Sequence, residues 1–124
     1  MLSLNDKDPR PIYEQVRDAL RLHILGGTIA PEEKLPSVRE LAASLAINPN
    51  TIQRAYRELE SEGLIYTMAG KGAFASSDGS AAARRKEMLL EKLRQDMTEL
   101  KLLKASRQEL EQALMAAYGK EEQP

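Results

Sequence analysis

Cysteine is absent from the 124-residue sequence, and histidine occurs only once. Without cysteine there can be no disulfide, thiol nucleophile or cysteine-bound metal, and one histidine leaves too few ligands for a zinc site. We therefore expect neither a metal nor a cofactor. Tryptophan is also absent, and the aromatic residues are four tyrosines and one phenylalanine. The hydrophobic content of 42% is mostly aliphatic, which suffices for a small helical core and excludes a disordered chain.

Long hydrophobic runs are missing too. No stretch approaches the roughly 20 apolar residues of a membrane-spanning helix, and residues 1–11 contain no hydrophobic signal core. We therefore expect a cytoplasmic protein without a membrane partner. An excess of one charge is also missing, because 18 basic side chains are balanced by 19 acidic ones, giving a net charge of -1. This balance excludes a generally basic coat as the basis of any nucleic-acid binding.

A small, polar stretch at 75–80 divides the chain into two predicted parts, residues 1–76 and 77–124. The first part carries turn residues and mixed periodicities. The second part is dominated by strong helix formers. The length therefore fits a small domain with a helical appendage and excludes a large two-lobed enzyme.

The first part begins with two predicted helices. Apolar spacing predicts one helix that starts at Pro11 and stops at Gly26. A short extended piece at 34–35 follows, because a proline disfavours helix at the residue before it. Ser37 and Glu40 then have the spacing of a capping box, in which each side chain bonds the other residue's backbone N–H. This box predicts the start of the second helix.

A third helix is predicted over 49–62, with Asn48 as its N-cap and Pro49 at its first position. After it, the β-rich segments 64–68 and 73–75 predict a hairpin. Two short helices joined by a tight turn and followed by a hairpin describe a winged helix-turn-helix. The predicted fold is therefore mainly α.

In such a fold the second helix of the pair places its N-terminal residues in the major groove of double-stranded DNA. The outward positions near the start of helix 49–62 carry side chains able to bond base edges or phosphates, namely Asn50, Thr51, Gln53, Arg54 and Arg57. Arg39, one turn into the second helix, can reach a phosphate. Lys71, between Gly70 and Gly72 at the hairpin tip, can enter the minor groove of DNA or contact its phosphate backbone.

Each feature alone also has a purely structural reading. Arg54 and Arg57 could pair with the acids at 58, 60 and 62 on a solvated helix. Residues 70–72 could be only a tight turn, and Asn48 with Pro49 only a helix start. Because all these segments fit one architecture in the right order, the joint pattern favours DNA binding.

The sequence resembles the winged helix-turn-helix of GntR-type bacterial transcription regulators over roughly residues 10 to 76, and it looks most like their YtrA-like branch. The resemblance rests on the following segments: Pro11–Val16, Lys34–Ala42, Asn48–Ile52, Arg54–Tyr56, Leu59–Glu60, Glu62–Ile65 and Gly70–Gly72. It implies a homodimeric repressor on a palindromic operator, often controlling its own operon with ABC-transporter genes. The DNA contacts that it implies are at Arg39, Asn50, Thr51, the position of Gln53, and Gly70 to Gly72.

The second part carries a predicted dimerisation seam. Leu90, Leu93, Met97 and Leu100 are spaced 3, 4 and 3 residues apart, as in the seam of a coiled coil. A second capping box, starting at Ser106, restarts a helix whose inward side includes Leu110 and Leu114. Two short helices cannot bury both apolar faces alone, so we expect them to pack on a second copy. The alternative is that they fold back on the first helix of their own chain.

These observations predict a DNA-binding transcription regulator. The alternative of another class is a protein-interaction adaptor that uses the winged fold without specific DNA binding. An enzyme is excluded, because the aminotransferase-like domains that accompany some such winged domains need several hundred further residues and a pyridoxal-binding lysine. The part after residue 76 is too short for a large effector pocket, so a small-molecule effector is not indicated, although a small apolar pocket between two subunits could hold one.

Overall fold

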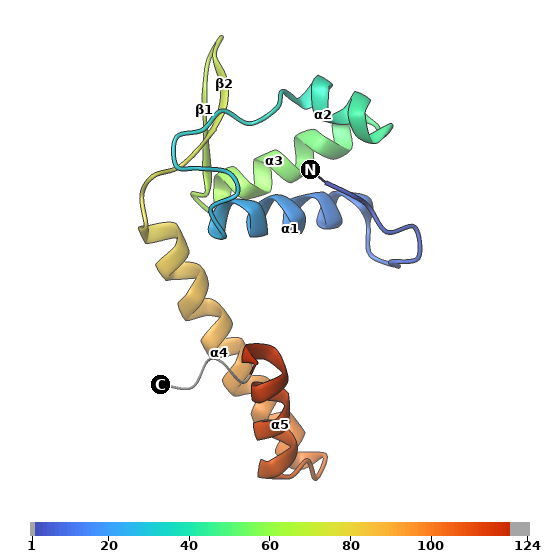
Figure 1. Cartoon of the computed structure of the whole chain (residues 1–124), viewed down its shortest axis with the longest axis vertical. Coiled ribbons are helices and arrows are strands. Elements are labelled where there is room, and N and C mark those ends of the chain that lie inside the picture. Colours follow the sequence, from blue (N-terminus) through green and yellow to red (C-terminus); the bar gives the residue numbers. More distant parts are fainter. Residues whose placement is uncertain (1, 120–124) are drawn as a thin grey trace. The chain divides into compact units, whose positions relative to one another are not determined.

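The computed structural model describes residues 2–119 (Figure 1). Its elements are α1 (Ile12–Leu25), α2 (Val38–Leu45), α3 (Pro49–Ser61), β1 (Ile65–Met68), β2 (Gly72–Ala75), α4 (Ser80–Leu102) and α5 (Arg107–Tyr118). The chain forms two compact units that divide between Arg84 and Arg85, inside α4. Three helices and a hairpin followed by further helices confirm the mainly α fold that the sequence predicts. Within residues 2–119, every helix is too short or too polar to span a lipid bilayer.

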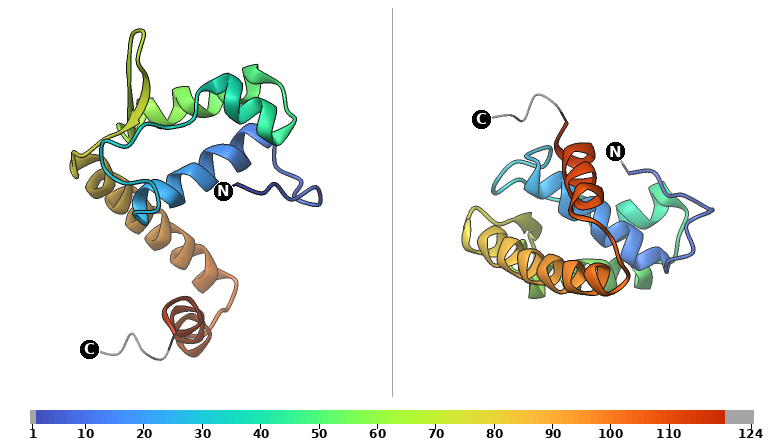
Figure 2. Two further views of the ribbon diagram at one scale, coloured as in Figure 1. Left: turned by 45° about the horizontal axis from the view of Figure 1, so that its top comes forward. Right: turned by 90° about the horizontal axis from the view of Figure 1, so that it is seen from below.

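The first unit is built around the contact between α1 and α3, which lie side by side in Figures 1 and 2. Val16 and Leu20 on α1 and Ile52 and Leu59 on α3 are fully buried. The two positions are four residues apart on α1 and seven apart on α3, which places them on one face of each helix. α2 also packs on α3 and adds Leu41 to the same core. The core therefore holds the helix pair α2–α3 at a fixed angle on α1.

Local signals set most helix ends in this unit. Ser37 Oγ accepts a hydrogen bond from the Glu40 N–H at 3.0 Å and Glu40 Oε1 accepts one from the Ser37 N–H at 2.9 Å, so the predicted capping box is present. Asn48 caps α3 by accepting from the Asn50 N–H at 2.8 Å. Pro11 differs from expectation, because its extended backbone, with ψ of 146°, makes it the N-cap, and α1 begins one residue later.

β1 and β2 form an antiparallel hairpin with Met68 opposite Gly72 at its tip. Lys34 adds a short bridge to Phe74 on the outer side of β2, so the extended piece predicted before α2 is confirmed. In Figures 1 and 2 the hairpin extends away from the three helices. The first unit is thus a winged helix-turn-helix, with the hairpin as its wing.

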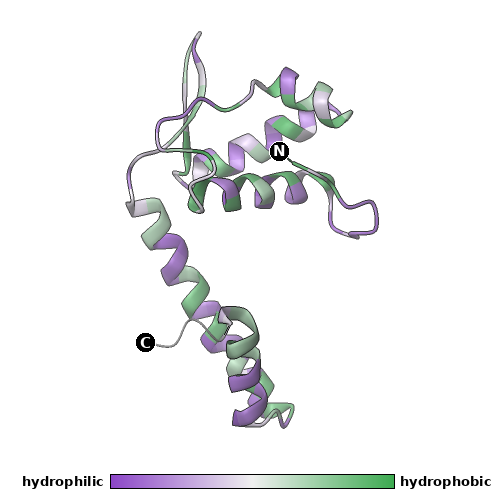
Figure 3. Ribbon diagram, in the orientation of Figure 1, coloured by the Kyte–Doolittle hydropathy of each residue, from purple (hydrophilic) through white to green (hydrophobic). Residues whose placement is uncertain are grey.

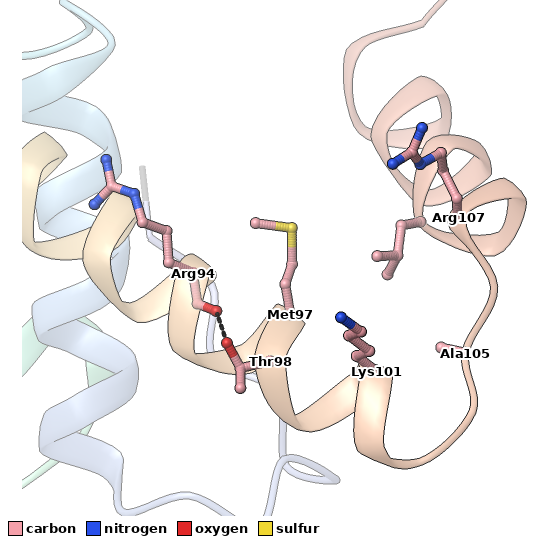
Figure 4. Close-up of a pocket in the computed structure, with 7 residues that line it drawn as sticks. Arg94, Met97, Thr98, Lys101, Ala105 and Arg107 are labelled. Atoms are coloured by element: carbon pink, nitrogen blue, oxygen red, sulfur yellow. Dashed lines mark hydrogen bonds between the residues drawn. The ribbon is translucent and has the colours of Figure 1, made fainter.

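In the second unit, α5 starts at a capping box, in which Ser106 Oγ accepts from the Glu109 N–H at 3.1 Å and Glu109 Oε1 accepts from the Ser106 N–H at 2.8 Å. Figure 3 shows hydrophobic and hydrophilic residues mixed along both helices. A groove of about 570 Å³ lies between α4 and α5, with Met97 and Lys101 on one side and Arg107 on the other (Figure 4). Leu110 of α5 also lines it.

Candidate DNA-binding surface

The first two turns of α3 expose polar side chains and carry no acid. Asn50, Gln53, Arg54 and Arg57 are exposed, whereas Thr51 is half-buried. The opposite face of the helix, with Ile52, Ala55, Tyr56 and Leu59, is in the core. Burial of that face therefore turns the predicted base-contacting residues outward. Because the cap at Asn48 uses the Asn50 amide, the helix N-terminus is also ordered.

Two of the three acids near the C-terminal end of α3 pair with α1, namely Glu58 and the C-cap residue Glu62, whereas Glu60 accepts a hydrogen bond from Thr67 of β1. Arg17 Nη1 on α1 lies 2.7 Å from Glu58 Oε1, and Arg21 Nη2 lies 2.6 Å from Glu62 Oε2. These two carboxylates are therefore largely neutralised within the fold. In the part of the chain that the structure describes, Arg57 forms no salt bridge, so the alternative of internal pairing does not apply to it.

Arg54 has a different neighbour from the one its sequence suggests. Its guanidinium carbon lies 3.6 Å from the centre of the Tyr13 ring, and its Nη2 donates a hydrogen bond to the Tyr13 hydroxyl at 3.0 Å. Arg54 Nε is 3.6 Å from Glu58 Oε2, a longer contact than the one between Glu58 and Arg17. Internal pairing of Arg54 with Glu58 is thus present but weak, and the main contact is a cation–π stack.

Arg39 lies exposed in the first turn of α2, one residue from the capping Glu40. The Ser37 backbone N–H, the Ser37 hydroxyl and the charge of Lys34 hold the pKa of Glu40 below its ordinary value. Glu40 is therefore ionised at neutral pH and engaged by the cap. This start of α2 combines an exposed cation with ordered backbone N–H groups, as a phosphate contact requires.

The tip of the wing presents Lys71 between two glycines. Gly70 and Gly72 have φ of +76° and +108°, values that L side chains rarely adopt, which accounts for glycine at both positions. The Lys71 N–H donates to the Met68 carbonyl oxygen at 2.9 Å and closes the turn, leaving the lysine side chain exposed.

Two residues of this surface are missing from the sequence-based prediction. A Cβ on Gly72 would lie 3.0 Å from Lys34 Cε, so the Lys34 side chain runs along β2 toward the tip of the wing, and its charge also acts on Glu40 at the start of α2. Tyr13 is the second, through its stack with Arg54. Lys34 could be anticipated because it precedes the Leu35–Pro36 segment that pairs with the wing. The contact between Tyr13 and Arg54 could not be anticipated, because no pattern of neighbouring residues indicates it.

Comparison with known proteins agrees with this geometry. Residues 12–75 match the family described as "Bacterial regulatory proteins, gntR family". The chain is 39% identical over 97 residues to the HTH-type transcriptional repressor YtrA of Bacillus subtilis (strain 168), a match that covers 77% of this chain and 75% of that protein.

Solved structures give the same result. A GntR family transcriptional regulator from Listeria monocytogenes is 32% identical, with a TM-score of 0.73 over 91% of this chain and 98% of its own. AraR(DBD) in complex with operator ORR3 is 32% identical, with a TM-score of 0.53 over 61% of this chain and 92% of its own. Regulators of this kind are not enzymes. Its winged helix-turn-helix and these similarities show that the chain belongs to the gntR family of bacterial regulatory proteins, as a transcription regulator with a DNA-binding winged helix.

Proposed function

We propose that the protein is a homodimeric repressor that acts in the bacterial cytoplasm and binds a palindromic operator, including that of its own operon with ABC-transporter genes. The similarity to a transcriptional repressor and to an operator-bound domain supports this proposal. In it, α3 of each protomer enters the major groove of one half-site, and the two-fold symmetry of the dimer matches that of the DNA.

The exposed, acid-free start of α3 is the observation that carries the proposal. Asn50 and Gln53 can each bond an adenine bidentately, and Arg57 can bond a guanine or a phosphate. Thr51, half-buried at the same end, suits a phosphate or a thymine methyl. Pairing of Glu58 and Glu62 with α1 reduces their repulsion of the phosphate backbone.

Phosphate contacts come from Arg39 on α2 and Lys71 on the wing, together with Arg54 and Arg57 on α3. Two protomers then neutralise at most about eight phosphates, so the logarithm of affinity should fall against the logarithm of salt with a slope no steeper than about -7. A much steeper slope would indicate that the basic run at 84–86 also contacts DNA.

Homodimerisation is supported by the apolar side chains that the second unit leaves in solvent. Leu93 is 51% exposed and Leu114 is 59% exposed, values unusual for residues at regular helical spacing. The remaining positions of the predicted seam are also incompletely covered, namely Leu90, Met97, Leu100 and Leu110. A second copy of the same chain offers matching faces on which these side chains can pack.

The test is selection of bound fragments from a random pool of double-stranded DNA. We expect enrichment of a palindrome, and loss of binding when Arg39 and Arg54 are both replaced by glutamate, because the new carboxylates repel phosphates. Lys92→Glu is the control charge reversal, at a residue of α4 to which the proposal gives no DNA contact, and it should keep binding. Failure of the wild-type protein to enrich any palindrome would overturn the proposal and favour a protein-interaction adaptor.

A further inference from the structure

α1 and α3 are joined by three side-chain pairs with the same offset of 41 residues. In chain order the pairs are Tyr13 with Arg54, Arg17 with Glu58, and Arg21 with Glu62. Successive pairs are four residues apart on both helices, which is about one helical turn. We call them the α1–α3 ladder. Its first pair, that of Tyr13 and Arg54, lies toward the N-terminal half of α3.

The polarity of the ladder reverses at this first pair. In the other two pairs the cation is on α1, and the carboxylate is on α3 (Glu58) or at its C-cap (Glu62). In the first pair the cation is on α3, and its partner on α1 is an uncharged phenol ring. A carboxylate at position 13 would have cancelled the charge of Arg54 and repelled a nearby phosphate. Tyrosine instead holds the arginine and leaves its charge available.

The contact orders the guanidinium and uses only one of its donors. An arginine has five N–H donors, and the Tyr13 hydroxyl accepts from only one nitrogen of Arg54. The side chain of Arg54 is still 54% exposed. The ring face restricts the plane of the guanidinium while its free edge can bond a DNA oxygen. Glu58 competes little for this arginine, because its nearer partner is Arg17.

We propose that Tyr13 is a positioning residue for DNA recognition, which orders Arg54 before binding so that the arginine contacts the operator without first losing its conformational freedom. This inference rests on the proposed use of α3 as the recognition helix. It predicts that Tyr13 acts through Arg54, and not through a contact of its own.

The test is a double-mutant cycle on the selected operator, with Tyr13→Leu, Arg54→Ala and the double variant. We expect Tyr13→Leu to weaken affinity by about 2- to 10-fold, the range for ordering one long side chain on binding. In the Arg54→Ala background the same substitution should change affinity less than about 2-fold, because there is no arginine left to order. Tyr13→Phe, which keeps the ring face and loses the acceptor, should lie between wild type and Tyr13→Leu.

Arg21→Met is the matched control, since it breaks another pair of the ladder without touching Arg54. It should lower thermal stability, and the change in operator affinity that it causes by freeing Glu62 should be the same in the wild-type and Arg54→Ala backgrounds. Additive losses in the cycle, or tighter binding by Tyr13→Leu, would overturn the role of Tyr13 while the wild type still binds its operator. A wild type that binds no operator would instead overturn the proposed function. If Tyr13→Leu does not fold, the cycle with Tyr13→Phe decides by the same criterion of additivity.

Discussion

Tyr56 shows how one residue can tie the recognition helix to the rest of the fold. It lies on the buried face of α3, and its hydroxyl donates to the Pro36 carbonyl oxygen at 2.6 Å. Burial, helped by the charge of Glu40, raises the pKa of Tyr56 to about 12. The phenol therefore stays protonated and donating at any physiological pH. The bond fixes α3 against the segment that leads into α2.

We expect Tyr56→Phe to lower the free energy of unfolding by about 0.5–1.5 kcal/mol, the usual net value of one such hydrogen bond. The ring still fills the core, so the loss isolates the hydroxyl. Urea denaturation at neutral pH measures it. Tyr118→Phe is the control, because Tyr118 is 63% exposed and its hydroxyl is accessible to water. Equal stability of Tyr56→Phe and the wild type would contradict this role.

At the scale of the element, the helix starts follow local chemistry. Both predicted capping boxes are present, and Asn48 with Pro49 begins α3 as expected. The end of α2 is different, since Ala46 takes a left-handed backbone with φ of +56°. No glycine marks this turn, so packing of the neighbouring α2 and α3 sets it. A helix cap that involves only neighbouring residues can thus be predicted from the sequence. A turn that depends on packing between two helices cannot.

The capping box of α2 should make stability depend on acid. Because the folded pKa of Glu40 lies below its ordinary value of 4.5, ionised Glu40 stabilises the fold. That contribution is complete above pH 4.5 and is lost as the pH falls through the folded pKa. Glu40→Gln keeps a hydrogen-bond acceptor but cannot titrate. We expect the variant to lose less stability than the wild type on acidification.

Thermal melting at neutral pH and below pH 4.5 measures this difference. Glu87→Gln, at an exposed position of α4, is the control for removal of one carboxylate. It should leave the acid dependence of the melting temperature as in the wild type. A Glu40→Gln variant whose melting temperature falls as steeply as that of the wild type would argue against the cap as the source.

In the candidate site, too, local patterns could be predicted from the sequence, whereas contacts between distant residues could not. Periodicity alone turns Gln53 and Arg57 outward, and the structure agrees. The ladder cannot be read in this manner, because its partners are 41 residues apart and depend on the register in which α1 meets α3. Arg54 therefore resembled a partner of Glu58 in sequence, although its nearest partner is Tyr13.

For the whole molecule, a net charge near zero is compatible with a basic surface, because acidic and basic side chains are unevenly distributed over the fold. Arg17 and Arg21 are used inside the fold to neutralise Glu58 and Glu62. The cations that remain exposed on the winged helix, such as Arg39, Arg57 and Lys71, are few and lie on the elements that face DNA in the proposed function. Such a protein should depend on specific contacts and on two linked half-sites for its affinity.

If affinity depends on two linked half-sites, dimerisation is the property of the whole molecule that must be tested. Leu93→Asp places a charge in the proposed seam of α4, and each dimer carries the substitution twice. Loss of two buried leucines, at about 1.5–3 kcal/mol each, should raise the dimer dissociation constant by at least about 100-fold. Affinity for the full palindrome should fall with it, because binding at the second half-site is no longer intramolecular. Affinity for an isolated half-site should be unchanged.

Sedimentation equilibrium measures the dimer constant, and titration of full and half operators measures the coupling. Leu102→Asp is the matched control, since Leu102 lies on the same helix, is 76% exposed and falls outside the seam spacing. It should leave both constants near those of the wild type. If Leu93→Asp stays dimeric, the seam is not the interface. If it becomes monomeric and still binds the full palindrome as tightly as before, the two half-sites are not linked through α4, and the reasoning from symmetry to operator fails.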